Sequence, residues 1–271
     1  MGQAKRWIEA RLLPHGWTDI LRQIGLFVGA FLLYDAVRGA VLDGNPYKPF
    51  GNAMKIIDFE RALHIFIEPS VQAWAEHKHV LMDILDWTYL NGHFFITLAA
   101  LVFIYFRRND SFYFVRNVLM ISMFIALFGY WLYPTAPPRL MPEWGFTDSV
   151  SQFVTHSKGY WDNTPAGAFA NAYAAVPSMH VCFSSIIGLT MVRLSTHRLV
   201  KIAWSLYPAL VTFVVVATAN HFLVDVFLGA LTAAISFALA QRLLARARPE
   251  VWAFGASRRV ASGRHLGQAT A

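Results

Sequence analysis

Long stretches almost free of charged residues are the feature that most restricts how this chain of 271 residues can fold. Only 14% of its residues are charged, whereas a soluble domain usually has about 25%. A segment of roughly 20 mostly apolar residues is long enough to cross a bilayer as a helix. The pattern therefore predicts an all-α integral membrane protein that crosses the membrane several times.

Six segments approach this length and composition: residues 20–42, 85–106, 112–134, 178–195, 199–219 and 221–243. They predict a bundle of six transmembrane helices in one domain over residues 1–246, followed by a basic, flexible cytoplasmic tail over residues 247–271. The N-terminal MGQAKRWIEARLLPHGW has no evident small-residue cleavage site, so we expect a cytosolic lead-in to a retained first helix.

Residues 53–77 follow a different pattern. Apolar and charged residues alternate at helical spacing in KIIDFERALHIFIEPSVQAWAEH. This indicates one or two amphipathic helices on the membrane surface, with the first ending at Pro69. An ordinary packed loop helix is the alternative interpretation.

The 23 Lys and Arg residues are distributed unevenly along the chain. If the N-terminus is cytoplasmic, the inner segments carry 15 of them and the outer loops 6. The positive-inside rule therefore predicts that both termini are cytoplasmic. The net charge of +7 would also suit a nucleic-acid partner, but basic residues clustered at helix ends favour a membrane protein that binds no nucleic acid. Cys182 is the only cysteine, so no disulfide can form within the chain.

This topology brings three polar motifs to the outer face: YPTAPPRL (133–140), VPSMHV (176–181) and NHFLVDVFLG (220–229). In the third motif, His221 and Asp225 are four residues apart and share one face of a helix. A carboxylate placed there can orient the imidazole and leave its other nitrogen available as a nucleophile or base. A simple ion pair at a helix start is the alternative.

The other two motifs supply groups that suit a phosphate. We expect Pro177 in the first turn of a helix, with Ser178 and unpaired backbone N–H groups facing a bound anion. His180 can protonate a departing oxygen. Arg139 follows two prolines, and its guanidinium can hold two phosphate oxygens. Taken singly, Ser178 is equally a helix cap, and the other two are ordinary interfacial residues. Together, the motifs suggest phosphoryl transfer through a phosphohistidine.

These motifs resemble the type-2 phosphatidic acid phosphatase superfamily, in which an arginine is followed by Pro-Ser-x-His and then His-x-x-x-Asp. The variant YPTAPPR, PSMH and NHFLVD is more similar to the branch that contains inositol phosphorylceramide synthase. The resemblance spans residues 133–229. It implies a six-helix membrane enzyme that needs no metal or other cofactor and acts on a lipid phosphate or phosphodiester. Water or an alcohol such as inositol would accept the phosphoryl group.

The resemblance also implies a role for each matching residue. His221 would be the nucleophile and Asp225 would orient it. His180 would be the acid for the leaving group, and Ser178 and Arg139 would bind the phosphate.

The chain departs from the family pattern at three positions. Leu132 stands where the first motif usually has a lysine, Val215 where the third has an arginine, and Met179 where the second has a glycine. Two cationic phosphate ligands are therefore replaced by apolar residues. His93, Asp83 and Asp86 lie near the start of the second predicted span. They could border the same pocket, but we interpret them as interfacial residues.

Two rival interpretations remain open from the sequence. His180, His221 and Asp225 would also make a metal site of two histidines and one carboxylate. A lipid transporter or lipid-binding membrane protein with a degenerate site would carry similar intramembrane polar residues. The transporter hypothesis predicts that His221→Ala retains function, whereas the phosphohistidine hypothesis predicts loss of turnover.

Overall fold

The computed structural model describes residues 16–40, 47–156, 173–255, 257 and 259–260. The predicted N-terminal lead-in falls almost entirely outside these residues. Within them the structure is helical, which confirms the predicted all-α class. The main helices are α2 (Gly16–Ala40), α3 (Lys48–Ala62), α4 (Glu68–Glu76), α5 (His79–Trp87), α6 (His93–Arg107), α7 (Asn109–Leu132), α8 (Ser149–His156), α10 (Met179–Leu194), α11 (Arg198–Ala217), α12 (Leu223–Leu239), α13 (Ala245–Ala247) and α14 (Pro249–Trp252).

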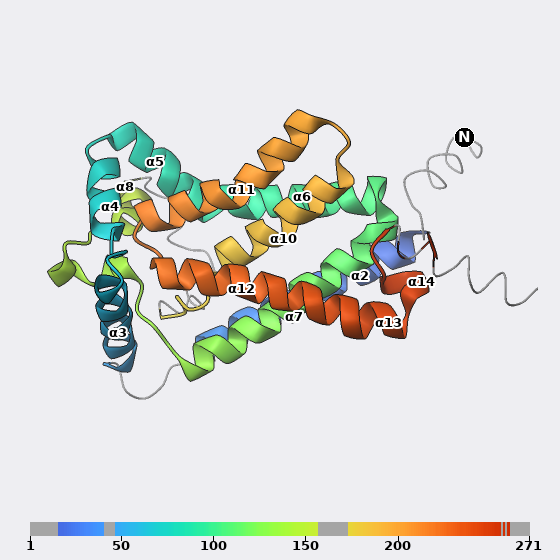
Figure 1. Cartoon of the computed structure of the whole chain (residues 1–271), viewed down its shortest axis with the longest axis horizontal. Coiled ribbons are helices and arrows are strands. Elements are labelled where there is room, and N and C mark those ends of the chain that lie inside the picture. The colour runs from blue at the N-terminus through green and yellow to red at the C-terminus, as the bar shows by residue number, and fades with distance from the viewer. Residues whose placement is uncertain (1–15, 41–46, 157–172, 256, 258, 261–271) are drawn as a thin grey trace, which may run out of the picture.

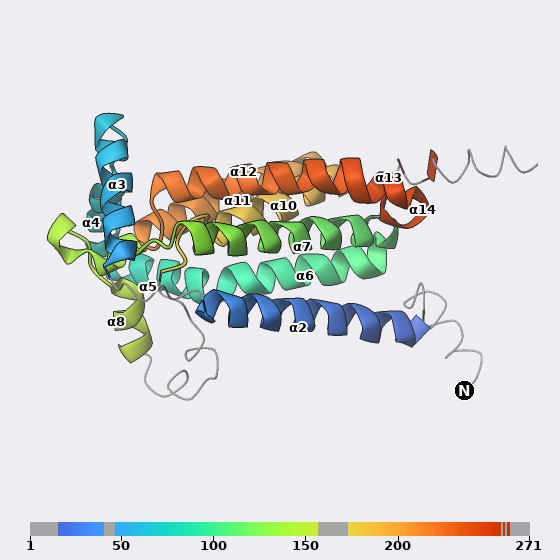
Figure 2. The ribbon, with the colours of Figure 1, turned by 90° about the horizontal axis from the view of Figure 1, so that it is seen from below.

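The long helices α2, α6, α7, α10, α11 and α12 run lengthwise in a bundle (Figure 1). At one end of this bundle, α3 lies across the bundle axis, with α4 and α8 beside it (Figure 2). The start of α2 and the helix α14 lie at the opposite end. The three polar motifs therefore lie at the end that carries α3, α4 and α8.

Four helical stretches in the described part of the chain are long and apolar enough to cross a membrane. They are His79–Arg107, Asn109–Leu132, Arg198–Ala217 and Leu223–Ala247, and Met179–Leu194 is a shorter apolar helix. The protein is thus a multi-pass membrane protein, but six spans are not shown. The first predicted span forms α2, which has 25 residues yet is not among the four. Four charged residues interrupt the apolar sequence of this helix.

The amphipathic segment forms two helices, α3 and α4, after α2. Pro69 lies in the first turn of α4, where its missing N–H group leaves no hydrogen bond unmade. The prediction that Pro69 ends a helix was therefore wrong, because α3 already ends at Ala62. Fully buried side chains such as Ile57 pack α3 against the loop after α7 and the start of α12, where Met141 and Phe222 lie.

The main apolar core lies among α6, α7, α10, α11 and α12 and includes Ile104, Val115 and Ile186. The short helix α14 packs against α7, and the rings of Phe254 and Phe114 lie 5.6 Å apart. The predicted start of a flexible tail at residue 247 falls just before this helix, and that division of the chain stays a prediction.

Candidate active site

The turn over residues 218–222 joins α11 to α12 and carries His221. The carbonyl of Val215, near the end of α11, accepts hydrogen bonds from the backbone N–H groups of Asn220 (2.9 Å) and His221 (3.2 Å). Ala219 adopts a φ of +49°, a left-handed conformation that is costly for a residue with a Cβ atom. These constraints hold the turn in one conformation and so fix where His221 lies relative to α12.

The imidazole of His221 is 5% exposed, and its Nδ1 atom lies 3.4 Å from Oδ2 of Asp225. This is ion-pair distance without hydrogen-bond geometry, and Nδ1 has no hydrogen-bond partner among the described residues. Burial lowers the pKa of His221 to about 3, opposed by a hydrogen bond to the Ala175 carbonyl and reinforced by the charge of Arg139. The imidazole is therefore neutral at neutral pH, as a nucleophile must be.

Asp225 is fully buried in the first turn of α12. Its Oδ2 atom accepts a hydrogen bond from the backbone N–H of Phe222 at 3.0 Å. Its backbone carbonyl accepts one from the N–H of Ser178 at 3.1 Å, which ties α12 to the start of α10. The two helices approach so closely that a methyl group on Gly229 would lie 2.3 Å from the Ser178 carbonyl oxygen. Only glycine permits this contact.

Ser178 is the N-cap of α10, and its Oγ atom accepts a hydrogen bond from the N–H of Val181 at 3.4 Å. Its side chain is fully buried. Pro177, which follows a cis peptide bond, lies one residue before this cap and not in the first turn as predicted, because the helix begins only at Met179. Phosphate binding by Ser178 stays a prediction, since its hydroxyl already caps the helix.

His180 lies in the first turn of α10 and is partly buried. Its ring centroid is 5.8 Å from that of His221. The ring of Tyr89 stacks on it at 4.5 Å, and that of His93 lies 5.0 Å away. Tyr89 comes from a π-helical turn, Thr88–Gly92, that precedes α6. Such turns occur often at functional sites.

A cavity of about 200 Å³ opens beside His180. Apart from His93 and His180, its lining is mostly apolar and includes Met179 and Phe183. On the other side of His93, the Nδ1 atom lies 3.2 Å from the hydroxyl of Tyr207 on α11. His93 was interpreted from the sequence as interfacial, and here its ring borders His180.

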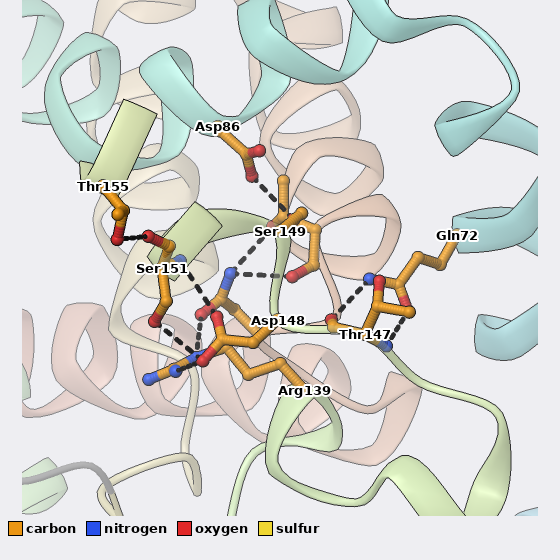
Figure 3. Close-up of polar contacts among 10 residues, drawn as sticks. Gln72, Asp86, Arg139, Thr147, Asp148, Ser149, Ser151 and Thr155 are labelled. Carbon is orange, nitrogen blue, oxygen red and sulfur yellow. Dashed lines mark hydrogen bonds and ion pairs between the residues drawn. The ribbon is translucent and has the colours of Figure 1, made fainter. Parts of the chain in front are cut away.

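Arg139 lies in the loop after α7, and its guanidinium reaches the turn that carries His221. Its Nε atom donates to Oδ1 of Asn220 at 3.0 Å, and its backbone N–H donates to the Ala219 carbonyl at 2.7 Å. Its Nη1 atom forms an ion pair with Oδ2 of Asp148 at 2.8 Å (Figure 3). The Arg139 side chain is 20% exposed, so an anion can still approach it.

Asp148 also caps α8, because its carboxylate accepts hydrogen bonds from the N–H (3.1 Å) and hydroxyl (2.8 Å) of Ser151 (Figure 3). The hydroxyl of the neighbouring Ser149 donates to Oδ1 of Asp86 at 3.0 Å. Asp86 is buried, although its position near a span end suggested the interface. This network anchors the partner of Arg139 to α5.

The two standard cation positions of the resembled family cannot supply a charge here. The Leu132 side chain is 55% exposed, and Val215 is fully buried, with its carbonyl holding the turn that carries His221. The amide of Asn220 lies beside Arg139 instead, and its Nδ2 atom donates to the carbonyl and hydroxyl of Thr218 at 3.0 and 2.9 Å.

The structure brings His180, His221, Asp225, Ser178 and Arg139 together at one end of the bundle, through the contacts above. The sequence did not single out Tyr89 or Asp148. No spacing pattern could have found them, because Tyr89 reaches His180 from another helix and Asp148 pairs with Arg139 within an irregular loop. Among the described residues, no group of three or more His, Cys, Asp or Glu side chains is arranged to hold a metal ion.

A comparison with protein-family models matches residues 54–239 to the family described as the PAP2 superfamily. The match covers the helices from within α3 to the end of α12, and so includes all three motifs. No curated protein and no solved structure matches the chain.

Proposed function

The chain belongs to the PAP2 superfamily, which implies phosphatase or phosphotransferase activity, and we propose that it acts on membrane lipids through a phosphohistidine at His221. The donor is a lipid phosphate or phosphodiester, and the acceptor is water or an alcohol. The motif variant that resembles inositol phosphorylceramide synthase supports an alcohol as one of these acceptors.

In the first half-reaction, the Nε2 atom of His221, which does not face Asp225, gives up its hydrogen bond to the Ala175 carbonyl and attacks the phosphorus, while Nδ1 carries the ring proton on the side of Asp225. A P–N bond forms while the P–O bond to the leaving group breaks. His180 gives its proton to the departing oxygen, which leaves as an alcohol. Arg139 stabilises the charge on the phosphoryl oxygens, together with Ser178 and the N-terminal amides of α10.

In the second half-reaction, His180 takes a proton from the acceptor. The acceptor oxygen attacks the phosphorus, the P–N bond breaks and His221 is released neutral. Water as acceptor gives a free phosphate product and makes the protein a phosphatase. An alcohol gives a new phosphate ester and makes it a headgroup transferase.

The observation that carries this proposal is the placement of a neutral, buried imidazole 5.8 Å from a second, more accessible one. That separation leaves one histidine to attack and the other to exchange the proton. The Asp225 carboxyl lies 3.4 Å from Nδ1 of His221 and the Arg139 guanidinium bonds to the adjacent Asn220, which supports phosphate binding next to the nucleophile.

A lipid substrate is supported by the cavities beside His180. The 200 Å³ cavity shares Phe27, Phe94, Leu98, Met123 and Phe183 with a neighbouring cavity of about 450 Å³. The larger cavity lies between α2, α6 and α7 and is lined mainly by apolar side chains. We propose that the hydrocarbon chain of the substrate lies along this path while its phosphate reaches the histidines.

We further propose that this end of the bundle faces the extracytoplasmic side. The distribution of Lys and Arg supports it, since the outer loops of that topology carry only 6 of the 23. A protease-cleavable tag at either terminus of the full chain should then resist protease added outside intact cells.

The test supplies the purified full-length protein in lipid vesicles with a panel of lipid phosphates and alcohol acceptors. Release of inorganic phosphate identifies a phosphatase, and a new phosphodiester identifies a transferase. We expect His221→Ala to lose turnover by about 10⁴-fold or more, as when a member of a concerted catalytic group is removed. The matched control is His197→Ala, an exposed histidine that precedes α11.

The intermediate gives a second measurement. Because a P–N bond is stable in alkali and labile in acid, labelled phosphate should stay on the wild-type protein after an alkaline quench. It should be absent from His221→Ala. Unchanged turnover in His221→Ala would reject the proposal, whereas a wild-type protein that turns over no lipid phosphate would favour the transporter hypothesis.

A further inference from the structure

Three consecutive backbone amides directly after His221 are each bound by a different carboxyl group. Asp225 accepts from Phe222 at 3.0 Å. Glu68 accepts from Leu223 at 2.9 Å, and Glu60 accepts from Val224 at 2.8 Å. The last two come from α4 and α3, which lie 155 and 164 residues away in sequence.

This arrangement exceeds what helix capping requires. The first amides of a helix lack partners within the helix, and one local side chain commonly satisfies one of them. Here two glutamates from other helices are fully buried to satisfy two more. Buried carboxyl groups are costly unless they are paired or protonated, so these two need a further explanation.

The second oxygen of each glutamate supplies that explanation. Oε2 of Glu60 and Oε2 of Glu68 are both buried, and among the described residues neither has a donor when both groups are ionised. The two carboxyl groups act directly on each other, and a hydrogen bond between them requires that one of them carry a proton. A single shared proton therefore satisfies both oxygens and removes one of two adjacent negative charges.

The electrostatics agree with this geometry. Burial, followed by the hydrogen bond to Glu68 and its charge, raises the pKa of Glu60 to about 9. The charged groups acting on the Glu60 carboxyl are Glu68 on α4 and Asp225 on α12, and both favour the protonated form. The shared proton stabilises the fold fully below pH 4.5, the ordinary pKa of a glutamate. This stabilisation is lost as the pH rises through about 9, the raised pKa of Glu60.

We infer that Glu60 and Glu68 share one proton and act as positioning residues that clamp the first turn of α12, and with it His221 and Asp225, to helices α3 and α4. The inference rests on the proposed role of His221 as nucleophile. Neither glutamate touches the substrate. Loss of the shared proton would place two negative charges beside Asp225 and loosen the turn that carries the nucleophile.

The decisive variant is Glu60→Gln. Its amide oxygen can still accept from Val224, and its NH₂ group can donate to the Glu68 carboxylate in place of the shared proton. We expect it to keep most of the wild-type kcat at neutral pH. Wild-type activity should fall above pH 9, by about tenfold per pH unit for loss of one proton. The activity of Glu60→Gln should show no such fall.

Glu60→Ala removes the acceptor of the Val224 amide, and Glu68→Ala removes that of the Leu223 amide. Each variant therefore frees the first turn of α12 from one neighbouring helix. We expect kcat to fall by about 10²-fold at neutral pH, the scale of a displaced catalytic group. Asp58→Asn is the matched control, because it removes one negative charge from the exposed face of the same helix. Thermal unfolding of each variant in vesicles distinguishes a misplaced turn from an unfolded chain. We expect Glu60→Gln to stay folded, because its amide keeps both hydrogen bonds.

Two results would overturn the inference: Glu60→Gln losing as much kcat as Glu60→Ala, or an alkaline limb identical to that of the wild type. Either leaves the phosphohistidine proposal intact, provided that His221→Ala is inactive. An active His221→Ala would instead remove the proposed function, whatever the glutamate variants do.

Discussion

The two histidines of the site are held in opposite ways. His221 is 5% exposed and sits in a turn fixed by backbone hydrogen bonds and carboxyl groups at the start of α12. His180 is only partly buried and lies among the rings of Tyr89, His93 and His221, beside a cavity. The α12 side is therefore a rigid polar network, and the α10 side is an accessible aromatic surface.

This difference matches the two roles proposed for them. A nucleophile has to meet the phosphorus along one direction, so fixed placement raises its rate. A proton donor has to reach leaving groups and acceptors of different shapes and exchange protons with them. Ring contacts beside a cavity allow this, whereas a buried turn does not.

The largest effect should come from breaking the polar side at Asp225→Asn. Asparagine keeps an oxygen for the Phe222 amide, but it presents an NH₂ group toward His221 that favours the wrong imidazole tautomer. We expect kcat to fall by up to about 10⁴-fold, as in other carboxylate–histidine pairs. Rapid-quench measurement should show that formation of the phosphohistidine has slowed.

Asp225→Ala separates orientation from capping. It also removes the hydrogen bond to Phe222, and we expect it to lower the free energy of unfolding by about 0.5–2 kcal/mol, the value of an N-cap. Near-normal turnover in Asp225→Asn would mean that the turn alone orients His221.

Sequence reasoning found the elements of the site better than the contacts between them. His221 and Asp225 are four residues apart on one helix, so their proximity follows from helical geometry. An alternating topology places Arg139, Ser178 and His180 at the same end of the bundle. Glu60 and Glu68 looked like the polar face of a surface segment, because periodicity cannot report that α12 covers them.

The helices show the same limit. The apolar runs predicted the strongly hydrophobic helices, but α2 has charged residues whose partners lie on other helices. Asp19, for example, accepts hydrogen bonds from the hydroxyls of Tyr105 and Tyr113, both at 2.8 Å. Such pairing depends on how the helices pack against one another, and neither the composition of a helix nor the spacing of its residues predicts that packing.

A smaller and more selective effect is expected on the α10 side, from His180→Gln. Removing a general acid costs about 10²–10⁴-fold for an alkyl leaving group, which needs a proton to depart. A nitrophenyl ester bearing the same alkyl chain needs none, so phosphohistidine formation from it should be almost unchanged. Comparing single-turnover rates on the two esters measures the difference.

The stability of His180→Gln provides the contrast with the α12 side. Because His180 lies in a partly exposed aromatic cluster, we expect a smaller change in the unfolding midpoint than for Asp225→Ala. Equal losses on both esters would contradict its role as acid and suggest that His180 supports His221 instead.

The smallest effect should come from Asp148→Asn. This variant tests Arg139, which links the loop after α7 to the turn that carries His221. Asp148 occupies Nη1 of Arg139 and so competes with a phosphate oxygen for it. The two side chains are 20% and 27% exposed, and ion pairs at such positions contribute up to about 1 kcal/mol. Removing the competitor should lower KM by up to about fivefold, the same free energy expressed as an affinity.

Asparagine in this position can still accept from the N–H of Ser151, so α8 keeps its cap. Glu143→Gln makes the same change of charge on an exposed residue of the same loop and serves as the control. If Asp148→Asn lowers KM while kcat is unchanged, phosphate binding by Arg139 is separable from the positioning of His221. A fall in kcat would show instead that the Asp148 ion pair holds Arg139 against Asn220, and that the rigid side of the site extends through the loop to α8.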